Sequence, residues 1–472
     1  MTAAAIFDLD RTLIPKPSGP VFQRHLVEAG ITEHFEIPGL ATVYRAYELI
    51  GENPGAMQMA RLAVRAARGW PVEDVVKAAT VAADELYEMV LPYGRLLIEE
   101  HHAAGRRVAL ATTTPDVLVR PLAERLGIDD VIATRWAVED GSFTGRIDGR
   151  FLWGRNKLGA VKAWAKEQGI DLAASYAYSD SVFDVPMLRS VGTPVAVNPD
   201  AQLAIIANLN RWQIRHLDVP VGVFKFGGRE LQEWLRPLNR PETVPYARFD
   251  IQGTENVPSK GSAILVFNHR SYFDSAAVNF TLAKAGRAAR FLGKKEVFDA
   301  PIIGPFTRMF GGIRVDRGTG SDEPLEKAIE ALNAGQLVSI APQGTIPRGP
   351  AFFDPELKGR WGAARLAHAT KAPVIPVGIW GTEKVWPRNR RLPNMWPSEL
   401  PQITVRVGGP VKLQYRSVDA DTKRIMEAIV DQLPPEAREH HVPTEEELAL
   451  TFPAGYAGDP TQEAERRPGT DT

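Results

Sequence analysis

The first half of the chain shows two patterns of hydrophobic and polar positions. A short apolar run at residues 4–7 is typical of a buried strand, and residues from about 15 to about 90 then follow helical spacing without a clear strand. Beyond them, apolar runs alternate with amphipathic helical segments, at residues 106–114, 117–127, 156–169, 175–181 and 193–200. This alternation predicts a doubly wound parallel-sheet α/β domain over residues 1–214, with a helical cap (about 15–90) inserted after its first strand.

A second α/β pattern occupies the other half of the chain. We predict a second α/β domain over residues 246–433, with strands expected at residues 262–269, 311–318, 335–345 and 372–382. Residues 215–245 are of mixed composition and favour a linker, since they contain Pro237, Pro241 and Pro245. Residues 434–472 are acidic and polar, and we expect this tail to be disordered.

Composition narrows the class of protein. A chain of 472 residues is too long for one ordinary core, and 44% hydrophobic with 24% charged residues is usual for a globular protein. The net charge of −1 creates no overall field that would attract nucleic acid, so no nucleic-acid partner is expected. The absence of cysteine excludes disulfides, thiolate zinc sites and a cysteine nucleophile, and it fits a reducing compartment.

Targeting signals are not evident in the sequence. The chain enters its first strand without the basic and apolar regions of a signal peptide. No stretch reaches the ~20 predominantly apolar residues that a membrane span needs. We therefore expect a cytoplasmic protein without a signal peptide or a transmembrane span.

Two carboxylates end the first strand, in the stretch "AAIFDLDRTLI". Asp8 and Asp10 are two residues apart, which is one strand period, so both should point to the same side. Unpaired, they would repel each other and one would take up a proton. A cation between them, or a role in chemistry, explains the arrangement.

Further polar residues follow the other predicted strands, at the edge where ligands bind in doubly wound sheets. Thr112 ends the second strand, Asp180 and Asp184 follow the third, and Lys157 opens the helix between them. Carboxylates from two strand ends predict a Mg²⁺ site. One carboxylate can then attack phosphorus while another protonates the leaving alkoxide. Thr112 and Lys157 can stabilise the phosphoryl oxygens.

This half of the chain resembles the haloacid dehalogenase superfamily, in the branch (subfamily IB) that contains phosphoserine phosphatases. The resemblance covers about residues 3–212 and rests on Asp8-Leu9-Asp10-Arg11-Thr12, Thr112, Lys157, Asp180 and Asp184. It implies that Asp8 is the nucleophile, Asp10 the general acid and base, and that Asp8, Asp10 and Asp180 contact Mg²⁺, with Asp184 in support. Taken singly, these residues also have ordinary interpretations, such as a turn threonine, a solvated lysine or a helix cap.

The second half contains a histidine five residues before an aspartate, in "VFNHRSYFDS". In one interpretation Ser271 and Asp274 form a helix capping box and His269 is a loop residue. In the other, Asp274 orients His269, whose second nitrogen acts as a base. No G-x-S-x-G elbow or cysteine supplies a nucleophile, so the pair would serve direct attack by a substrate hydroxyl on an activated acyl group.

Cationic residues follow this segment in the sequence. Residues 284–317 carry eight Lys or Arg against three acidic residues, a net charge of +5. Arg317 follows a predicted strand, and "PQGT" follows another. Gly344, with neighbouring backbone amides, and Thr345 could hold a phosphate, with Arg317 pairing to it.

This half resembles the glycerolipid acyltransferase family (1-acyl-glycerol-3-phosphate acyltransferases) over about residues 248–415. The resemblance rests on three sequence motifs. The first contains Asn268, His269 and Asp274, and the second contains Gly312, Ile313 and Arg317. The third contains Gln343, Gly344 and Thr345, with Arg348 further on. The family has Glu where this chain has Gln343, and an Arg directly after the Thr, where this chain has Ile346. The resemblance implies acyl transfer from acyl-CoA or acyl carrier protein to lysophosphatidic acid or glycerol 3-phosphate.

Together the two halves predict a bifunctional enzyme of phospholipid biosynthesis that also hydrolyses a phosphomonoester. One alternative is an acyltransferase with a regulatory or structural phosphatase-like domain, and another is a peripheral lipid-binding protein without catalysis. In segments 296–315 and 376–396 the apolar residues of predicted strands are expected to belong to the core, and the others favour docking on an anionic membrane surface, at the inner face of the cell membrane. Their apolar residues include Phe298, Ile302, Ile303, Phe306, Met309, Phe310, Trp380, Trp386 and Trp396.

Overall fold

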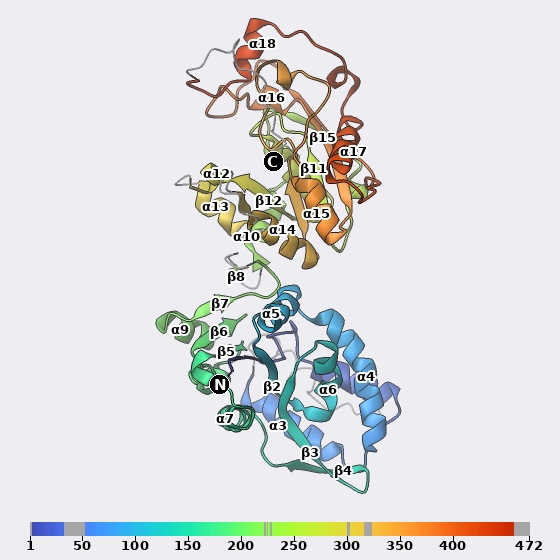
Figure 1. Ribbon diagram of the computed structural model, residues 1–472, viewed down its shortest axis with the longest axis vertical. Coiled ribbons are helices and arrows are strands. Elements are labelled where there is room, and N and C mark those ends of the chain that lie inside the picture. Colours follow the sequence, from blue (N-terminus) through green and yellow to red (C-terminus); the bar gives the residue numbers. More distant parts are fainter. Residues whose placement is uncertain are drawn as a thin grey trace. The chain divides into compact units, whose positions relative to one another are not determined.

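The computed structural model describes residues 2–32, 52–220, 223, 225–226, 229–299, 303–315 and 323–456. The chain divides into two compact units, Met1–Val221 and Gly222–Thr472 (Figure 1). The division lies inside the segment for which the sequence predicts a linker. That segment contains short elements, namely β8 (Lys225–Phe226), β9 (Arg229–Glu230) and α10 (Leu231–Leu235).

The first unit is built on a seven-stranded sheet in the order β4-β3-β2-β1-β5-β6-β7. Its strands are β1 (Ala4–Phe7), β2 (Arg107–Pro115), β3 (Asp130–Glu139), β4 (Ser142–Asp148), β5 (Tyr176–Ser179), β6 (Thr193–Val197) and β7 (Gln213–Arg215). Neighbouring strands are parallel except β3 and β4. Because consecutive side chains of a strand point to opposite faces, Phe7 of β1 packs in one core and Ile6 in the other.

Helices cover both faces of this sheet. One face packs against α1 (Gly19–Glu28), α3 (Pro54–Ala66), α4 (Val72–Met89), α5 (Pro92–Ala103) and α6 (Asp116–Arg125). The other packs against α7 (Arg155–Gln168), α8 (Val185–Leu188) and α9 (Ala201–Leu209). The prediction of a doubly wound α/β fold is confirmed, with α1, α3 and α4 between the first two strands of the chain. The sequence-based prediction missed the β3–β4 hairpin, whose turn has positive φ at Asp140 (46°) and Gly141 (74°).

The second unit contains another seven-stranded sheet, in the order β10-β16-β15-β11-β14-β12-β13. Its strands are β10 (Arg248–Gln252), β11 (Ala263–Phe267), β12 (Ala289–Lys294), β13 (Ile313–Val315), β14 (Leu337–Ile340), β15 (Val374–Trp380) and β16 (Gln402–Val407). Only the β15–β16 pair is antiparallel. The four strands predicted from the sequence correspond to β11, β13, β14 and β15, whereas β10, β12 and β16 were missed.

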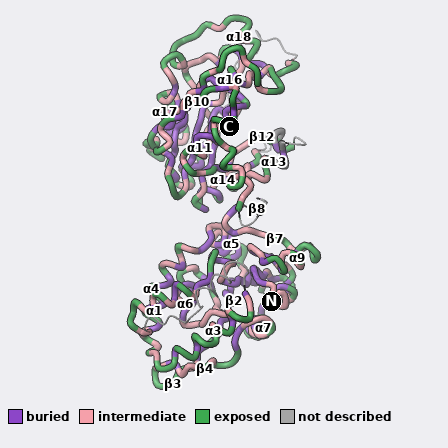
Figure 2. The backbone as a smooth tube through the Cα atoms, turned by 180° about the vertical axis from the view of Figure 1, so that it is seen from behind, coloured by how far each residue is buried: buried purple, intermediate pink, exposed green. Residues whose placement is uncertain are grey.

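The helices of the second unit also lie on both sides of its sheet. α11 (Asp274–Lys284) and α16 (Thr382–Val385) pack on one face, and α14 (Glu323–Asn333), α15 (Gly362–Thr370) and α17 (Val418–Val430) pack on the other. The remaining helices are α12 (Lys295–Asp299), α13 (Ile303–Met309) and α18 (Glu445–Leu450). Figure 2 shows the central strands of each unit as mainly buried backbone, in agreement with these two cores.

The acidic segment after residue 433 differs from its prediction. Thr444 caps α18 in a capping box with Glu447, and Phe452 is buried. The backbone amide of Gly349 donates to Thr451 Oγ1 at 2.8 Å. The expectation of disorder is therefore wrong as far as these residues: average composition favoured disorder, but a few apolar side chains are enough to pack the segment onto the domain. Residues 457–472 lie outside the described residues.

No helix in the described part of the chain combines the length and the apolar character needed to cross a bilayer.

Candidate active sites

The predicted residues of the first unit meet at the carboxyl ends of its central strands. Asp8 directly follows β1, and its backbone amide donates to Tyr178 O of β5 at 2.9 Å. Thr112 lies in β2, and Asp180 directly follows β5. Because β2, β1 and β5 are adjacent and parallel, their carboxyl ends bring these side chains to one edge of the sheet.

Lys157 of α7 occupies the middle of this cluster. Its side chain is fully buried, and Nζ lies 2.9 Å from Asp8 Oδ1 and 2.7 Å from Asp184 Oδ2. Ser179 Oγ donates to the same oxygen of Asp184 at 2.8 Å. Burial alone lowers the pKa of Lys157, yet the nearby carboxylates raise this pKa well above its usual value. Lys157 is thus a buried cation, and its interpretation as a solvated lysine is excluded.

The carboxylates of the cluster outnumber its cations. Burial and the charges of neighbouring acidic groups raise the pKa of Asp8 well above its usual value, although Lys157 opposes the shift. Burial likewise raises the pKa of Asp180, with a further contribution from Asp8. Arg11 Nε lies 3.1 Å from Asp180 Oδ2, and Thr12 Oγ1 donates to Asp180 Oδ1 at 3.3 Å. The ionised cluster therefore carries excess negative charge.

Asp10 faces the chain that enters the cap. The backbone amide of Ser18 donates to Asp10 Oδ1 at 2.7 Å, and Thr114 Oγ1 donates to Oδ2 at 3.4 Å. Burial raises the pKa of Asp10, while the hydrogen bonds from Ser18 and Thr114 lower it in part. A carboxyl group with a raised pKa holds a proton more readily, as a general acid must. Thr112 Oγ1 accepts from the backbone amide of Thr114 at 3.2 Å.

Glu52 is a member of the cluster that sequence reasoning missed. It lies just before α3, is buried, and accepts from Ser181 Oγ at 2.7 Å and from Trp153 Nε1 at 3.2 Å. Burial raises its pKa, and the charge of Lys157 opposes the shift. No motif or spacing marks Glu52, since it approaches the core only through the fold of the cap.

The fit of a divalent cation can be judged from these side chains. Within the described ranges, no three acidic or histidine groups are arranged as a complete set of metal ligands. The charge excess and the donor type nevertheless suit Mg²⁺, which prefers carboxylate oxygens. Asp184 Oδ1 is buried and has no hydrogen-bond partner among the described residues. The residues thus fit the cation in charge and chemistry.

In the second unit, His269 and Asp274 form a direct contact. His269 Nδ1 lies 2.7 Å from Asp274 Oδ2. A carboxylate can only accept, so Nδ1 carries the hydrogen and Nε2 is the nitrogen left for a base. Asp274 is fully buried, whereas the His269 side chain keeps 23% of its surface exposed. This geometry is the one required by the chemical interpretation of the pair.

The backbone holds Asp274 in this position. The amides of Arg270 and Ser271 donate to Asp274 Oδ2 at 2.7 and 2.8 Å, and Thr382 Oγ1 donates to Oδ1 at 2.5 Å. Ser271 Oγ donates to Trp386 O, at 2.6 Å, and accepts from the amide of Phe273. The N-cap of α11 is Phe273, without a side-chain cap. One bond of the capping box is thus present, from the Ser271 amide to Asp274 Oδ2, whereas the Ser271 hydroxyl accepts from the Phe273 amide and not from the Asp274 amide. The capping-box interpretation holds only in part, and the same carboxylate also contacts His269.

Asn268 and Gln343 fix the backbone around the histidine. The side-chain amide of Asn268 donates to Ile379 O at 2.8 Å and accepts from the Ile379 amide at 2.7 Å. It thereby continues the β11–β15 pairing one step beyond Phe267. Gln343 Oε1 accepts from the backbone amide of His269 at 2.7 Å. Gln343, which stands where the resembling family has Glu, thus contacts the segment that carries His269 as a neutral acceptor.

The expected phosphate-binding residues lie in two places. Gly344 and Thr345 follow β14 next to Gln343, and Gly344 has a φ of 72° that favours glycine. The Arg348 guanidinium lies 5.7 Å from the centre of the Tyr456 ring. Gly312 has no room for a larger side chain, since a Cβ would lie 2.7 Å from Thr307 Cγ2. Arg317 lies outside the described residues.

Arg270, beside the histidine, was also missed by sequence reasoning. Its guanidinium lies 4.2 Å from the centre of the Phe352 ring and 4.0 Å from that of Trp380, and it pairs with Glu383 at 3.1 Å. These contacts connect the His269 segment to the chain that follows the Gly344 turn. The sequence does not predict these contacts, because Arg270 and its partners lie far apart along the chain.

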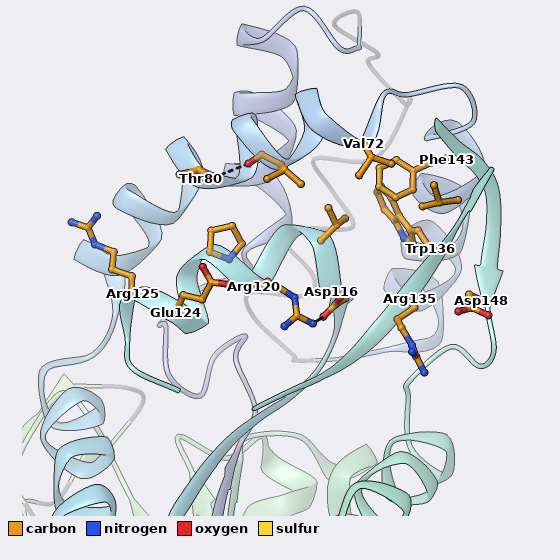
Figure 3. A pocket seen from close by; sticks show the side chains of 14 residues that line it. Val72, Thr80, Asp116, Arg120, Glu124, Arg125, Arg135, Trp136, Phe143 and Asp148 are labelled. Carbon is orange, nitrogen blue, oxygen red and sulfur yellow. Dashed lines mark hydrogen bonds and ion pairs between the residues drawn. The ribbon is translucent and has the colours of Figure 1, made fainter. Parts of the chain in front are cut away.

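A pocket of about 700 Å³ opens elsewhere in the first unit, between α4, α6 and the β3–β4 hairpin (Figure 3). Val72, Trp136 and Phe143 contribute apolar surface. Its charged lining balances, with Arg120, Arg125 and Arg135 against Asp116, Glu124 and Asp148. None of the predicted site residues lines it, so this pocket lies apart from the predicted site.

Comparisons with known families agree with the division of the chain. A family model described as haloacid dehalogenase-like hydrolase matches residues 5–189, and one described as acyltransferase matches residues 248–380.

Individual relatives match one half or the other. The "Inhibition of morphological differentiation protein" of Streptomyces azureus is 38% identical over 226 residues, which are 46% of this chain and 79% of the relative. "Phosphoserine phosphatase SerB1" of Mycobacterium tuberculosis is 37% identical over 218 residues, 46% of this chain and 71% of the relative. The solved 1-acyl-sn-glycerophosphate acyltransferase PlsC of Thermotoga maritima is 22% identical and covers 43% of this chain and 78% of its own, with a TM-score of 0.34.

Proposed function

The chain belongs to the haloacid dehalogenase-like hydrolases and carries an acyltransferase domain after its hydrolase domain, and on this premise we propose that it is a bifunctional enzyme of phospholipid biosynthesis. The first unit would hydrolyse a phosphomonoester through a phospho-aspartate. The second would transfer an acyl group from acyl-CoA or acyl carrier protein to lysophosphatidic acid or glycerol 3-phosphate.

Asp8 is the proposed nucleophile. Lys157 holds Asp8 Oδ1, which leaves Oδ2 to attack phosphorus while the bond to the leaving oxygen breaks. Asp10 protonates the departing alkoxide and then takes a proton from the water that hydrolyses the phospho-aspartate. Thr112 and Lys157 would bind the phosphoryl oxygens.

Mg²⁺ is the proposed cofactor of this unit. Asp8, Asp10 and Asp180 would hold it, with Asp184 in support. When bound, it supplies positive charge that keeps neighbouring carboxylates ionised and polarises the phosphoryl group. The raised pKa values of Asp8 and Asp180 support such a counter-charge.

His269 is the proposed base of acyl transfer. Its Nε2 takes the proton of the acceptor hydroxyl while that oxygen forms a bond to the thioester carbonyl carbon. The tetrahedral adduct then collapses, the carbon–sulfur bond breaks, and the same proton passes to the thiolate. Asp274 stabilises the imidazolium. The observation that carries this proposal is the contact between His269 Nδ1 and the buried Asp274 carboxylate.

The acceptor phosphate would bind opposite this histidine. The turn at Gly344 and Thr345 is the proposed phosphate site, together with Arg317 and Arg348. Gln343 supports it through its bond to the His269 amide. A neutral Gln at this position, in place of the family Glu, removes one negative charge that would repel an anionic acceptor.

Two alternatives make different predictions. The first keeps the acyltransferase active and gives the first unit a regulatory or structural role. The second is a peripheral lipid-binding protein without catalysis. The buried Lys157 between two carboxylates and the polarised His269 argue against both, because each arrangement exceeds what packing requires.

A single experiment separates these functions. Purified protein is incubated with acyl-CoA, glycerol 3-phosphate and lysophosphatidic acid, and the products are followed by mass spectrometry, with and without EDTA. We expect phosphatidic acid in both conditions, and phosphate release only without EDTA. Acyl transfer alone would favour the first alternative, and the absence of both products would favour the second.

Peripheral attachment to the inner face of the cell membrane is part of this proposal, with one correction. Phe298 is buried, contrary to the sequence-based expectation, because it packs beside Gly293 and Gly312. Ile302 and the side chains of Ile303 and Phe306 lie outside the described residues. Trp396, in contrast, is 84% exposed.

A further inference from the structure

Exposed apolar side chains gather in one loop of the second unit, between α16 and β16. In this 390–400 loop, Trp396 is 84% and Leu392 69% exposed, and Met395 and Leu400 are exposed as well. Single exposed apolar residues are common on protein surfaces. Across the residues that the structure describes, however, no other run of nine holds four large ones. Such a concentration marks an interaction surface.

The charges of the loop indicate the kind of partner. Arg390 and Arg391 are exposed at its start, and Glu399 is the one acidic residue among residues 390–400. Cationic groups beside aromatic and aliphatic side chains are the composition of segments that bind at the surface of an anionic bilayer. The core of a protein interface, in contrast, is depleted in charge. The loop therefore suits a lipid surface.

The base of the loop is ordered. Trp386 Nε1 donates to Arg390 O at 3.0 Å, and the backbone amide of Asn394 donates to Val385 O at 2.8 Å. These two bonds fix the start and the middle of the loop against the end of α16. The apolar side chains are thus presented from a defined backbone.

The same tryptophan connects the loop to the catalytic segment. Ser271 Oγ donates to Trp386 O at 2.6 Å, and the Tyr272 ring lies 5.6 Å from the Trp386 ring. Tyr272 is itself 46% exposed and follows His269 by three residues. A surface that binds the loop would consequently lie close to the segment that carries the proposed base.

We propose that the 390–400 loop docks the acyltransferase unit on an anionic membrane surface. Trp396 and Leu392 enter between the headgroups, and Arg390 and Arg391 contact lipid phosphates. The inference rests on the proposed acyl transfer and deepens it, because lysophosphatidic acid is a membrane lipid and would reach His269 from the surface that the loop contacts.

Co-sedimentation with vesicles tests the proposal without measuring activity. The full chain is mixed with vesicles of phosphatidylcholine and phosphatidylglycerol, and separately with phosphatidylcholine alone. The double variant Leu392→Ser/Trp396→Ser should bind the anionic vesicles at least about tenfold more weakly than the wild type. The matched control is Leu209→Ser, which changes a 79% exposed leucine in α9 and should bind like the wild type.

The arginines are tested separately. Arg390→Gln/Arg391→Gln should weaken binding to the anionic vesicles roughly fivefold per arginine, and added salt should reduce the difference. Binding to phosphatidylcholine alone should be unchanged by this variant.

Several outcomes would overturn the proposal. One is an anionic-vesicle affinity of Leu392→Ser/Trp396→Ser equal to that of the wild type. Another is a wild-type dimer that this variant abolishes, which would assign the loop to a second copy of the chain. Vesicle binding without acyl transfer in the wild type would instead leave the docking surface in place and refute the proposed reaction.

Discussion

Asp8 and Asp274 are both buried aspartates next to the carboxyl end of a central strand, but their surroundings differ in kind. Asp8 lies among other carboxylates and forms an ion pair with Lys157. Asp274 accepts four hydrogen bonds, from His269 Nδ1, two backbone amides and Thr382. The first site accumulates negative charge, whereas the charge of Asp274 in the second site is stabilised by backbone amides, a hydroxyl and one imidazole.

This difference predicts how each site depends on what it binds. A cluster with excess negative charge gains most from a cation and reacts strongly to loss of one carboxylate. A site preassembled by the backbone needs no metal to take its shape, and the acyl transfer proposed for it would depend on the histidine. The two activities should therefore respond to different treatments.

Asp8→Asn should produce the largest effect. Loss of the proposed nucleophile should reduce phosphate release by at least about 10³-fold, and acyl transfer should stay within about twofold of the wild type. Both rates are measured on the same purified protein. Ser190→Ala, a change outside the cluster, serves as the control. An equal fall of both activities in Asp8→Asn would contradict the proposal of two separate sites, because it would indicate one shared site.

His269→Ala should produce the reverse pattern. Loss of the proposed general base should reduce acyl transfer by ~10²–10⁴-fold, and phosphate release should be unaffected. Asp274→Asn should also be severe, because the imidazolium loses its counter-charge and the side-chain amide no longer fixes the hydrogen on Nδ1. Circular dichroism at the same concentration checks that the variants are folded. Wild-type acyl transfer by folded His269→Ala would refute the assignment.

A smaller effect concerns stability and pH. Asp421 of α17 accepts from the amides of Gln414 and Tyr415 and contacts His368 and Arg424. Although burial raises the pKa of Asp421, these hydrogen bonds lower it from 3.8 to about 2. A lowered pKa means that the ionised carboxylate stabilises the fold above pH 3.8, and that this contribution disappears as the pH falls to about 2.

Asp421→Asn should therefore destabilise the second unit by roughly 1–3 kcal/mol near neutral pH, and the difference from the wild type should shrink in acid. The raised pKa values of Asp8 and Asp180 have the opposite effect on stability, since protonation removes the cost of burying their charges and relieves the repulsion between acidic groups. Urea unfolding at several pH values, resolved by hydrogen exchange within each unit, measures both. A constant difference between Asp421→Asn and the wild type down to pH 2 would contradict the assignment.

Most of the architecture was accessible from the sequence, because alternating apolar runs and helical segments identify an α/β fold. Strands with a weaker signal were missed. The run 402–407 alternates polar and apolar residues and forms β16, and the Asp140–Gly141 turn marks the β3–β4 hairpin. Both patterns belong to antiparallel strands, whereas the prediction searched for the continuous apolar runs of parallel ones.

The residues of the two candidate sites also divide into those that the sequence predicts and those that it does not. The spacing of Asp8 and Asp10 and the position of Asp180 after a strand are local signals that the sequence displays. Glu52 carries no such signal, because a buried charge is defined by what surrounds it in space. The backbone donors of Asp274 could not be predicted for the same reason, since any residue supplies an amide and only the fold aims it.

The placement of β16 shows that the segment matched by the acyltransferase family does not contain the whole sheet of the second unit. The acyltransferase match ends at Trp380, the last residue of β15, yet β16 comes later in the chain and lies between β15 and β10. In the described sheet, β10 pairs with β16 alone. The matched segment is thus shorter than the segment that forms the sheet, and β10, inside the match, is held in the sheet by β16, which lies outside it.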